Sequence, residues 1–468
     1  MKRALIILSL AGLTGCAHFV SQPLAPAQTA VQLESQGLSD PGLRRFLEQN
    51  LGRTLPVWPL PEWNLTTLTL AAFYYQPSLA VARAQWGVSE AGVKTAGGRP
   101  NPTLTLLPGY DTTATVISHW LPLGSLDWPV ETAGKRGKRI AGAQALADSA
   151  RWDIITTAWQ VRANVRDTLL DWQIAERRSV LLEQECALQA QIVQRLEQRA
   201  AAGEVARPEL VTAQIARRRM ESDRLAAQAQ SSDARARLAG ALGLGTAALA
   251  GIKVAADLPA DLPPALTAPE ARRVALTTRS DIMGALADYA AAEDDWKLEI
   301  AKQYPDVHVN PGYQYNQGDN QWMLGVTLEL PVLNQNQGPI AEAEARRKLA
   351  AAKFMALQAQ VISQLDQAAA NYQRAQEQLA SGENLSQAEG EQAAATEAQL
   401  KAGAADQFDL LAAQLDQAGT TLSQLDNTAQ LLRARGALED ALQQPLDALT
   451  PAVFQNLTQE PTLKKSSP

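Results

Sequence analysis

The sequence predicts a mainly α-helical fold that contributes to a transmembrane β-barrel and is built from two copies of one structural half. The segment that begins at Gly203 is echoed by one that begins at Gly403, with Leu, Ala and Gln at the same spacings after each glycine. Each half carries two runs in which apolar and polar residues alternate, as in β-strands. Each half then continues into two long runs with helical periodicity. A repeat of this length indicates a duplicated half rather than a solenoid.

The first 15 residues are interpreted as a lipoprotein signal peptide. Lys2 and Arg3 form a basic start, and the apolar run at 4–13 is too short to span a bilayer. It leads into the sequence Leu-Thr-Gly-Cys at 13–16, which resembles a bacterial lipoprotein box, so Cys16 is expected to carry the lipid. Ala17 follows, which favours sorting to the outer membrane. The alternative is a plain secretion signal in which the cysteine falls by chance.

The rest of the chain divides at changes of composition. A stretch rich in Pro, Gln and Leu precedes the first helical periodicity, and a Pro-rich link separates the two halves. Each half is expected to open with one helix, at 65–96 and at 269–303. The predicted segments are a signal peptide at 1–15, an extended N-terminal segment at 16–64, a first repeat at 65–249, a linker at 250–268, a second repeat at 269–445 and a C-terminal tail at 446–468.

The clearest strand pattern lies in the second half. Two alternating runs, at 305–316 and 322–330, flank the turn-forming residues 317–320 and predict a β-hairpin. Strands of about ten residues are long enough to cross a bilayer when tilted. The apolar residues expected to face lipid are Val307, Val309, Tyr313, Trp322, Leu324, Val326 and Leu328. A half-buried sheet in a soluble protein would give the same alternation.

The first half has a less regular hairpin, with arms at 102–110 and about 115–128. Trp120 and Trp128 are suited to the membrane interfaces, where aromatic side chains are enriched. Asp127 near the end of this hairpin and Glu329 near the end of the second are expected to face the lumen, and His308 is expected to be a lumen wall residue.

Four long helices are predicted after the strands, at 135–202, 207–242, 339–401 and 406–442. The first lacks proline throughout, and at about 1.5 Å per residue it would extend roughly 100 Å. The apolar seams are narrow and rich in alanine, which suits close packing of the coiled-coil type. Helices of this length do not fit a compact globule.

The number of strands indicates that several chains must assemble. Strands in hydrocarbon have to close into a barrel, because an open edge leaves backbone groups unpaired. Bacterial barrels begin at about eight strands, and one chain offers four. Two chains would give eight strands, and three would give a twelve-strand barrel continued by a twelve-helix tunnel. The expected assembly is a conduit with a barrel in the outer membrane and a tunnel in the periplasm.

Composition argues against several other classes of protein. The net charge is −7 and is spread along the chain, so no nucleic-acid partner is expected. The chain has 3 His, 2 Cys and 5 Met, too few and too scattered to suggest a metal site or a cofactor. The sequence contains no nucleophile elbow, zinc-protease motif or phosphate loop, and no enzymatic activity is expected.

At this point the sequence resembles the TolC-like outer-membrane efflux proteins over roughly residues 65–445. The matching features are the lipoprotein box, the duplicated halves, Asn101-Pro102 and Tyr304-Pro305 before the strands, and the paired glycine segments. The run at 131–139 resembles a segment of the CzcC-like, heavy-metal branch. The resemblance implies a passive homotrimeric channel, anchored in outer-membrane lipid. It would work with a periplasmic adaptor and an inner-membrane pump of the RND type. Its cargo would be metal cations, the choice that the CzcC-like run favours, or drugs or exported toxins, which use the same architecture.

The same resemblance implies that the turns between the long helices are the periplasmic tips, where the tunnel closes and the adaptor docks. The tip or gate residues are Gly203, Arg207, Glu209, Gly403, Asp406 and Asp409. Threefold symmetry would turn each acid into a ring that favours cations. The alternative role for the acids is to stabilise the first turn of a helix. As a hypothesis, Arg207 pairs with Asp406 or Asp409 of a neighbouring half or chain.

The basic run Lys135, Arg136, Lys138 and Arg139 follows the first hairpin directly. It is suited to contact phospholipid headgroups of the inner leaflet. The alternative is a solvated helix start.

The competing interpretation of the whole chain is a periplasmic coiled-coil adaptor or scaffold lipoprotein that does not span the membrane. A lipid-binding enzyme is a more distant alternative. The hairpin at 305–330 discriminates between these interpretations, because only the channel places its apolar face against lipid.

Overall fold

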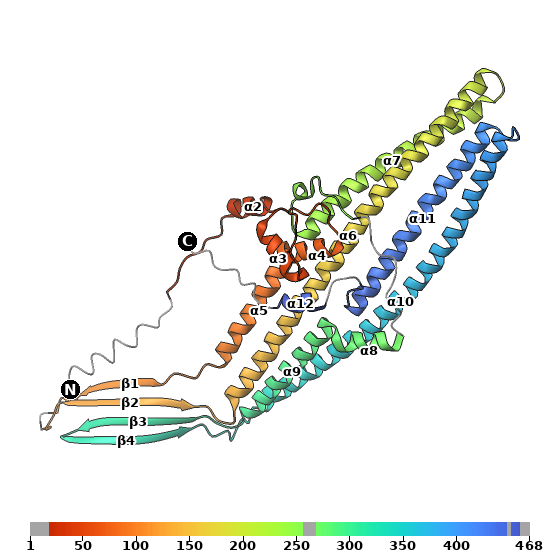
Figure 1. Ribbon diagram of the computed structural model, residues 1–468. Coiled ribbons are helices and arrows are strands. Elements are labelled where there is room, and N and C mark those ends of the chain that lie inside the picture. The colour runs from red at the N-terminus through yellow and green to blue at the C-terminus, as the bar shows by residue number, and fades with distance from the viewer. Residues whose placement is uncertain (1–17, 114, 256–267, 447–450, 459–468) are drawn as a thin grey trace.

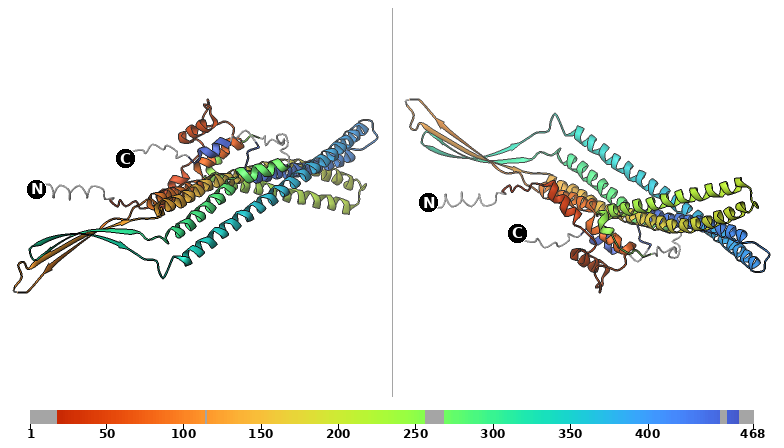
Figure 2. Two further views of the ribbon diagram at one scale, coloured as in Figure 1. Left: turned by 90° about the horizontal axis from the view of Figure 1, so that it is seen from below. Right: turned by 90° about the horizontal axis from the view of Figure 1, so that it is seen from above.

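The computed structural model describes residues 18–113, 115–255, 268–446 and 451–458 (Figure 1). The signal peptide, Cys16, most of the predicted linker and part of the predicted tail lie outside the described residues. The molecule is elongated, with four strands at one end and two helical hairpins that run to the other end (Figure 2).

The four predicted long helices are confirmed. In the first half α6 spans Lys135–Ala201 and α7 spans Arg207–Leu242. In the second half α10 spans Gln337–Lys401 and α11 spans Gln407–Leu442. The duplication extends to length, since α6 and α10 have 67 and 65 residues and α7 and α11 have 36 each.

The helix that opens each half is divided, and the prediction of one continuous helix is wrong in both. The pieces are α4 at Leu65–Tyr75 and α5 at Pro77–Ala96 in the first half, and α8 at Ala268–Thr278 and α9 at Ser280–Ala301 in the second. In the first half Pro77 disfavours helical geometry in the residue before it, and Gln76 has extended angles of φ −66° and ψ 119°. In the second half Arg279 is extended, with φ −61° and ψ 136°.

At each break the chain meets the end of another long helix, and we call this meeting point a joint. In the first half α7 meets α5, and in the second half α11 meets α9. The Gln76 side chain donates from Nε2 to the carbonyl of Ala241 at the end of α7, at 3.0 Å. Arg279, 203 residues later, donates from Nη1 to the carbonyl of Ala441 at the end of α11, at 2.6 Å. At each break the side chain therefore satisfies a terminal carbonyl of the facing helix, which has no partner within its own helix.

The N-terminal segment is not simply extended, which corrects the prediction for 16–64. It contains α2 at Pro26–Glu34 and α3 at Pro41–Leu51. Asp40 caps α3 by accepting from the amide of Gly42 at 2.7 Å. Leu43 and Leu47, one helical turn apart, are fully buried in the main core of the molecule. An amphipathic helix with a capped start can form in a Pro-rich stretch when such a core receives its apolar side.

This core lies beside the middle of α6 and includes α4, the end of α7 and the short helix α12 at Pro451–Asn456. Phe454 of α12 stacks on Trp159 with ring centroids 4.3 Å apart. A 3₁₀ helix at Thr246–Leu249 follows α7, and Trp63 pairs with Val254 in an isolated bridge. The core therefore fastens both ends of the described chain to the middle of the long helices.

The strands form one antiparallel sheet in the order β1-β2-β3-β4. They span Thr103–Tyr110, Trp120–Val130, Val307–Asn316 and Asp319–Leu328. Pairing of β2 with β3 joins the two halves. This confirms the two hairpins, although β4 begins earlier than the predicted second arm.

Candidate functional site

One face of the sheet is apolar and exposed. The register places Val309 opposite Val326 and Tyr313 opposite Trp322. Trp322 is 81% exposed and Leu324 is 74% exposed, so the described residues leave much of this face uncovered. The predicted lipid-facing residues of the second hairpin share it: Val307, Val309, Tyr313, Trp322, Leu324, Val326 and Leu328. The first hairpin extends the same face with Leu104, Leu106, Tyr110, Trp120, Leu126, Trp128 and Val130. An apolar surface of this extent marks an interaction site.

The opposite face of the sheet is polar near its helical end. Asp127 of β2 accepts hydrogen bonds from His308 Nδ1 at 2.9 Å and from Asn310 Nδ2 at 3.0 Å, both on β3. Thr327 of β4 donates to Asn310 at 3.1 Å. These side chains make a row across three strands. The four strands contain no Lys or Arg, so the ionisable groups on this face are acids and His308.

At the junction of sheet and helices, the loop at 131–134 and the start of α6 are bonded to the loop at 302–306 of the second half. The Lys135 ammonium lies 2.8 Å from Asp306 Oδ1. Thr132 donates its amide to the same oxygen at 2.9 Å and its hydroxyl to the carbonyl of Pro305 at 2.6 Å. Burial by itself would raise the pKa of Asp306, but the bonds from Lys135 and Thr132 hold that pKa below its usual range.

The rest of the basic run is also engaged within the chain. Arg136 donates from Nε to the carbonyl of Gly97 at 2.7 Å, just after α5 ends. Arg139 forms a two-pronged ion pair with Glu131, which raises the pKa of Arg139. Lys138 donates to the carbonyl of Ala133 at 3.0 Å. The basic residues therefore form hydrogen bonds and ion pairs within the chain. Neither of the two interpretations from the sequence, contact with lipid headgroups or a solvated helix start, includes these bonds.

The two helix tips, the turns at 202–206 and 402–406, share one backbone geometry. Gly203 and Gly403 have φ of 77° and 75°, a conformation that glycine adopts without strain. The amide of Glu204 donates to the carbonyl of Arg199 at 2.9 Å, and that of Ala404 donates to Gln399 at 2.8 Å. This is the Schellman pattern, which satisfies carbonyls at a helix end. The glycines are thus required by the turns themselves.

The acids at the tips have local partners. Asp406 and Asp409 form a reciprocal capping box at the start of α11, with each side chain accepting the other's amide at 2.9 Å. Glu209 lies in the first turn of α7 and is exposed. The stabilising role considered for Asp409 therefore has a structural basis, and Asp406 shares it.

Within the chain, the ion-pair partner of Asp406 is Arg199, which the sequence reasoning missed. Arg199 Nη1 lies 3.4 Å from Asp406 Oδ2 and so links the two tips. Arg207 is exposed at the start of α7. The signal for Arg199 was present, because basic residues favour the last turn of a helix. Pairing of Arg207 with an acid of another chain stays a prediction.

A buried ionic cluster joins the two halves farther along the helices, and the sequence reasoning missed it as well. Arg162 of α6 is fully buried and donates from Nε to Glu439 of α11 at 2.9 Å. Arg166, one turn later, donates from Nη2 to Asp440 at 2.6 Å. Burial alone would lower the pKa of Arg166, but Asp440 and the neighbouring carboxylates raise it above the usual value. Arginines one turn apart on an apolar helix side were the available signal.

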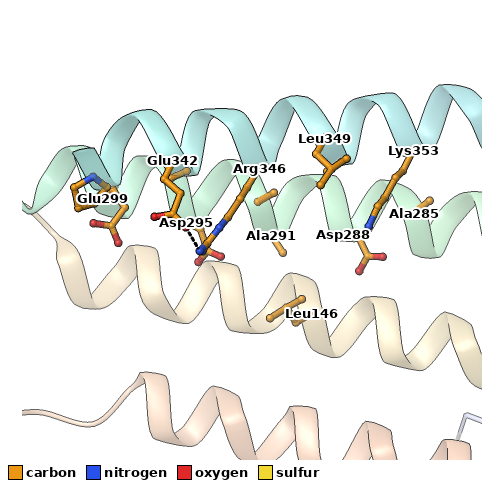
Figure 3. Close-up of a pocket in the computed structure, with 14 residues that line it drawn as sticks. Leu146, Ala285, Asp288, Ala291, Asp295, Glu299, Glu342, Arg346, Leu349 and Lys353 are labelled. Carbon is orange, nitrogen blue, oxygen red and sulfur yellow. Dashed lines mark hydrogen bonds and ion pairs between the residues drawn. The ribbon is translucent and has the colours of Figure 1, made fainter. Parts of the chain in front are cut away.

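A cavity of about 500 Å³ lies between α9 and α10, with Leu146 of α6 at its edge (Figure 3). Its acids are Asp288, Asp295, Glu299 and Glu342, and its cations are Arg346 and Lys353. Arg346 forms an ion pair with Glu342. Across the described part of the chain, no group of three or more His, Cys, Asp or Glu residues is arranged to hold a metal ion.

None of the helices in the described ranges combines the length and hydropathy needed to cross a membrane.

The sequence matches the outer membrane efflux protein family over residues 72–244 and 271–443, one stretch in each half. The cobalt-zinc-cadmium resistance protein CzcC of Cupriavidus metallidurans is 26% identical over 294 residues, which cover 62% of this chain and 68% of that protein. The outer membrane protein VceC of Vibrio cholerae has a similar fold, with a TM-score of 0.67 at 18% identity over 82% of this chain and 97% of VceC. CusC gives a TM-score of 0.66 at 16% identity over 91% of this chain and 99% of CusC.

These findings confirm the resemblance to TolC-like channels and to the CzcC-like branch. The structures share the fold with this chain, and the family match spans most of both halves. The chain belongs to the outer membrane efflux protein family.

Proposed function

We propose that three copies of this chain form the outer-membrane channel of a tripartite efflux system. The observation that carries the proposal is the sheet, which has an exposed apolar face on one side and a polar row on the other, in series with helices of up to 67 residues. The apolar face is suited to lipid and the polar face to a water-filled lumen. The channel is passive and performs no catalytic step.

The assembly follows from the open edges of the sheet. β1 and β4 are the outer strands, and each has one unpaired edge within the chain. Edges of this kind have to be closed in a membrane. Three copies would close a twelve-strand barrel, above the minimum of about eight strands. The helices of three copies would continue it as a twelve-helix tunnel through the periplasm.

The cargo we propose is metal cations. The relative named as a cobalt-zinc-cadmium resistance protein supports this, and so does the absence of Lys and Arg from the strands. Acids such as Asp127 on the polar face would favour cations in a lumen. A periplasmic adaptor and an inner-membrane pump of the RND type would deliver the cargo, and a lipid on Cys16 would anchor the chain in the outer membrane.

The test is negative-stain electron microscopy of the detergent-purified protein, combined with its oligomer mass from light scattering. We expect a trimer and a narrow cylinder roughly 100 Å or longer, the length of α6 at about 1.5 Å per residue. A monomer or dimer that stays soluble without detergent after removal of the lipid would refute the channel and favour a periplasmic scaffold.

For the tips, we propose that Arg207 pairs with Asp406 or Asp409 of a neighbouring chain and holds the tunnel closed. Arg207→Ala is expected to raise the conductance of trimers in planar bilayers, because three inter-chain ties are lost. Arg199→Ala is the matched control, since it removes the pair with Asp406 inside one chain. Unchanged conductance in Arg207→Ala would exclude this form of closure.

A further inference from the structure

Four segments connect the sheet with the helices, and hydrogen bonds link each segment, or the helix end beside it, to its neighbour. The segments are 97–102, 131–134, 302–306 and 329–336. Within the first half, Arg136 joins the start of α6 to the end of α5 through the Gly97 carbonyl. Within the second half, Asn336 Nδ2 joins the start of α10 to the end of α9 through the Glu299 carbonyl, at 2.8 Å. An arginine in the first half and an asparagine amide in the second thus make the same link between two helix ends.

The middle tie connects the two halves, and we call it the junction clamp: Thr132 and Lys135 on one side, Pro305 and Asp306 on the other. Lys135 is only 7% exposed although it carries a charge. A buried cation needs an opposite charge to compensate it. The Lys135 ammonium therefore holds the Asp306 carboxylate beside it. Both donors converge on one oxygen, Asp306 Oδ1. Hydrogen bonds to charged groups are among the strongest in proteins and are directional.

The clamp lies at the end of the ladder that joins the halves. The last register pair of β2 and β3 is Val130 with Val307. Val130 lies two residues before Thr132, and Val307 directly follows Asp306. On the helical side, α6 and α9 pack closely at Gly142, where an added Cβ would lie 3.3 Å from Asp295 Oδ1. The clamp therefore bridges the interval between a paired sheet and a close helix contact.

We propose that Asp306, held by Thr132 and Lys135, is a positioning residue that sets the width of the lumen where the barrel meets the tunnel. The inference rests on the proposed function, because it assigns a consequence to a conduit formed by three chains. Each chain contributes one clamp, so three clamps lie around the lumen at one level. Releasing them lets strands β2 and β3 separate at the helical end, while the apolar face of the sheet and the helix packing are left intact.

The experiment compares Lys135→Met and Asp306→Asn with Lys138→Met in the full chain. Lys138 belongs to the same basic run and is half-buried, but it has no carboxylate partner among the described residues, and its ammonium donates to the carbonyl of Ala133. The first measurement is hydrogen–deuterium exchange of the detergent-purified protein over 128–130 and 307–309. The second is unit conductance of purified trimers in planar bilayers.

For Lys135→Met and Asp306→Asn we expect amide exchange about tenfold faster in these segments, consistent with loss of a hydrogen bond to a charged group. We also expect an altered unit conductance with normal trimer yield. Lys138→Met should match the wild type in both measurements. Wild-type exchange in the clamp variants would overturn the proposal, and so would faster exchange with wild-type conductance, because the clamp would then be structural only.

Two further results keep the test decisive. If neither clamp variant assembles, Thr132→Val, which removes only the hydroxyl bond to the Pro305 carbonyl, should still give a unit conductance different from that of the wild type. Wild-type conductance in Thr132→Val would overturn the proposal. If wild-type protein forms no conducting trimer, the proposed function fails, whereas the exchange measurement still reports on whether the clamp holds the two halves together.

Discussion

Val326→Arg is expected to lose most of its assembled, heat-resistant form in the outer membrane. Val326 lies on the apolar face, opposite Val309, and is 66% exposed. In a barrel this side chain would meet lipid, where an arginine costs up to about 2–4 kcal/mol per chain, the upper value applying at the midplane. Three copies multiply the penalty. The measurement is the amount of heat-resistant oligomer on unheated gels of outer-membrane fractions.

Thr327→Arg is the matched control, because the next residue along β4 points to the opposite face. Thr327 pairs with His308 in the register and donates to Asn310. An arginine there would enter a water-filled lumen, so oligomer yield should stay near that of the wild type. Equal yields for the two variants would mean that the apolar face does not contact lipid, and the channel proposal would lose its main support.

Glu439→Ala is expected to destabilise the helical body strongly. Glu439 is 4% exposed and compensates Arg162, which has no exposed surface at all. Removing one partner of a buried ion pair costs about 3–5 kcal/mol, because the remaining buried charge loses the opposite charge that compensated it. Thermal unfolding followed by circular dichroism in detergent should show a lower midpoint and a smaller yield of folded protein.

Glu342→Ala provides the control for this prediction. Glu342 pairs with Arg346 one turn away, and both side chains are mostly exposed, at 62% and 70%. An exposed pair contributes about 0–1 kcal/mol, so the midpoint should hardly move. The double variant Arg162→Met with Glu439→Met should recover much of the lost stability, since it removes both charges of this pair together, while Arg166 keeps its pair with Asp440. Equal midpoints for Glu439→Ala and Glu342→Ala would contradict the assigned role of the buried cluster.

Periodicity explains what could be predicted from the sequence. The alternation from Val307 to Leu328 is local, and the register pairs its apolar residues across one face as expected. The long helices needed only an uninterrupted pattern without proline in their interiors. The glycines at both tips fall where positive φ is needed. In each case the residues that carry the pattern lie within one element or one turn.

The missed features depend on residues that are far apart in the chain. Lys135 and Asp306 are separated by 171 positions, and Arg162 and Glu439 by 277. The residues near one member of such a pair do not indicate where its partner lies. From the sequence alone the basic run therefore indicates only lipid or solvent as its surroundings. The break at Arg279 is of the same kind, because its reason is a carbonyl of α11 rather than a neighbouring proline.

The joints between α7 and α5 and between α11 and α9 divide the helical part of the molecule into two sections. Because separate helix ends meet at each joint, the section between the joint and the tip can gain or lose whole helical turns without shifting the strands. Such a change has to be matched in the two halves, because α7 and α11 both have 36 residues and their tips lie at one level. Insertions in this family should therefore occur in pairs, and the length of the proposed tunnel can evolve separately from the proposed barrel.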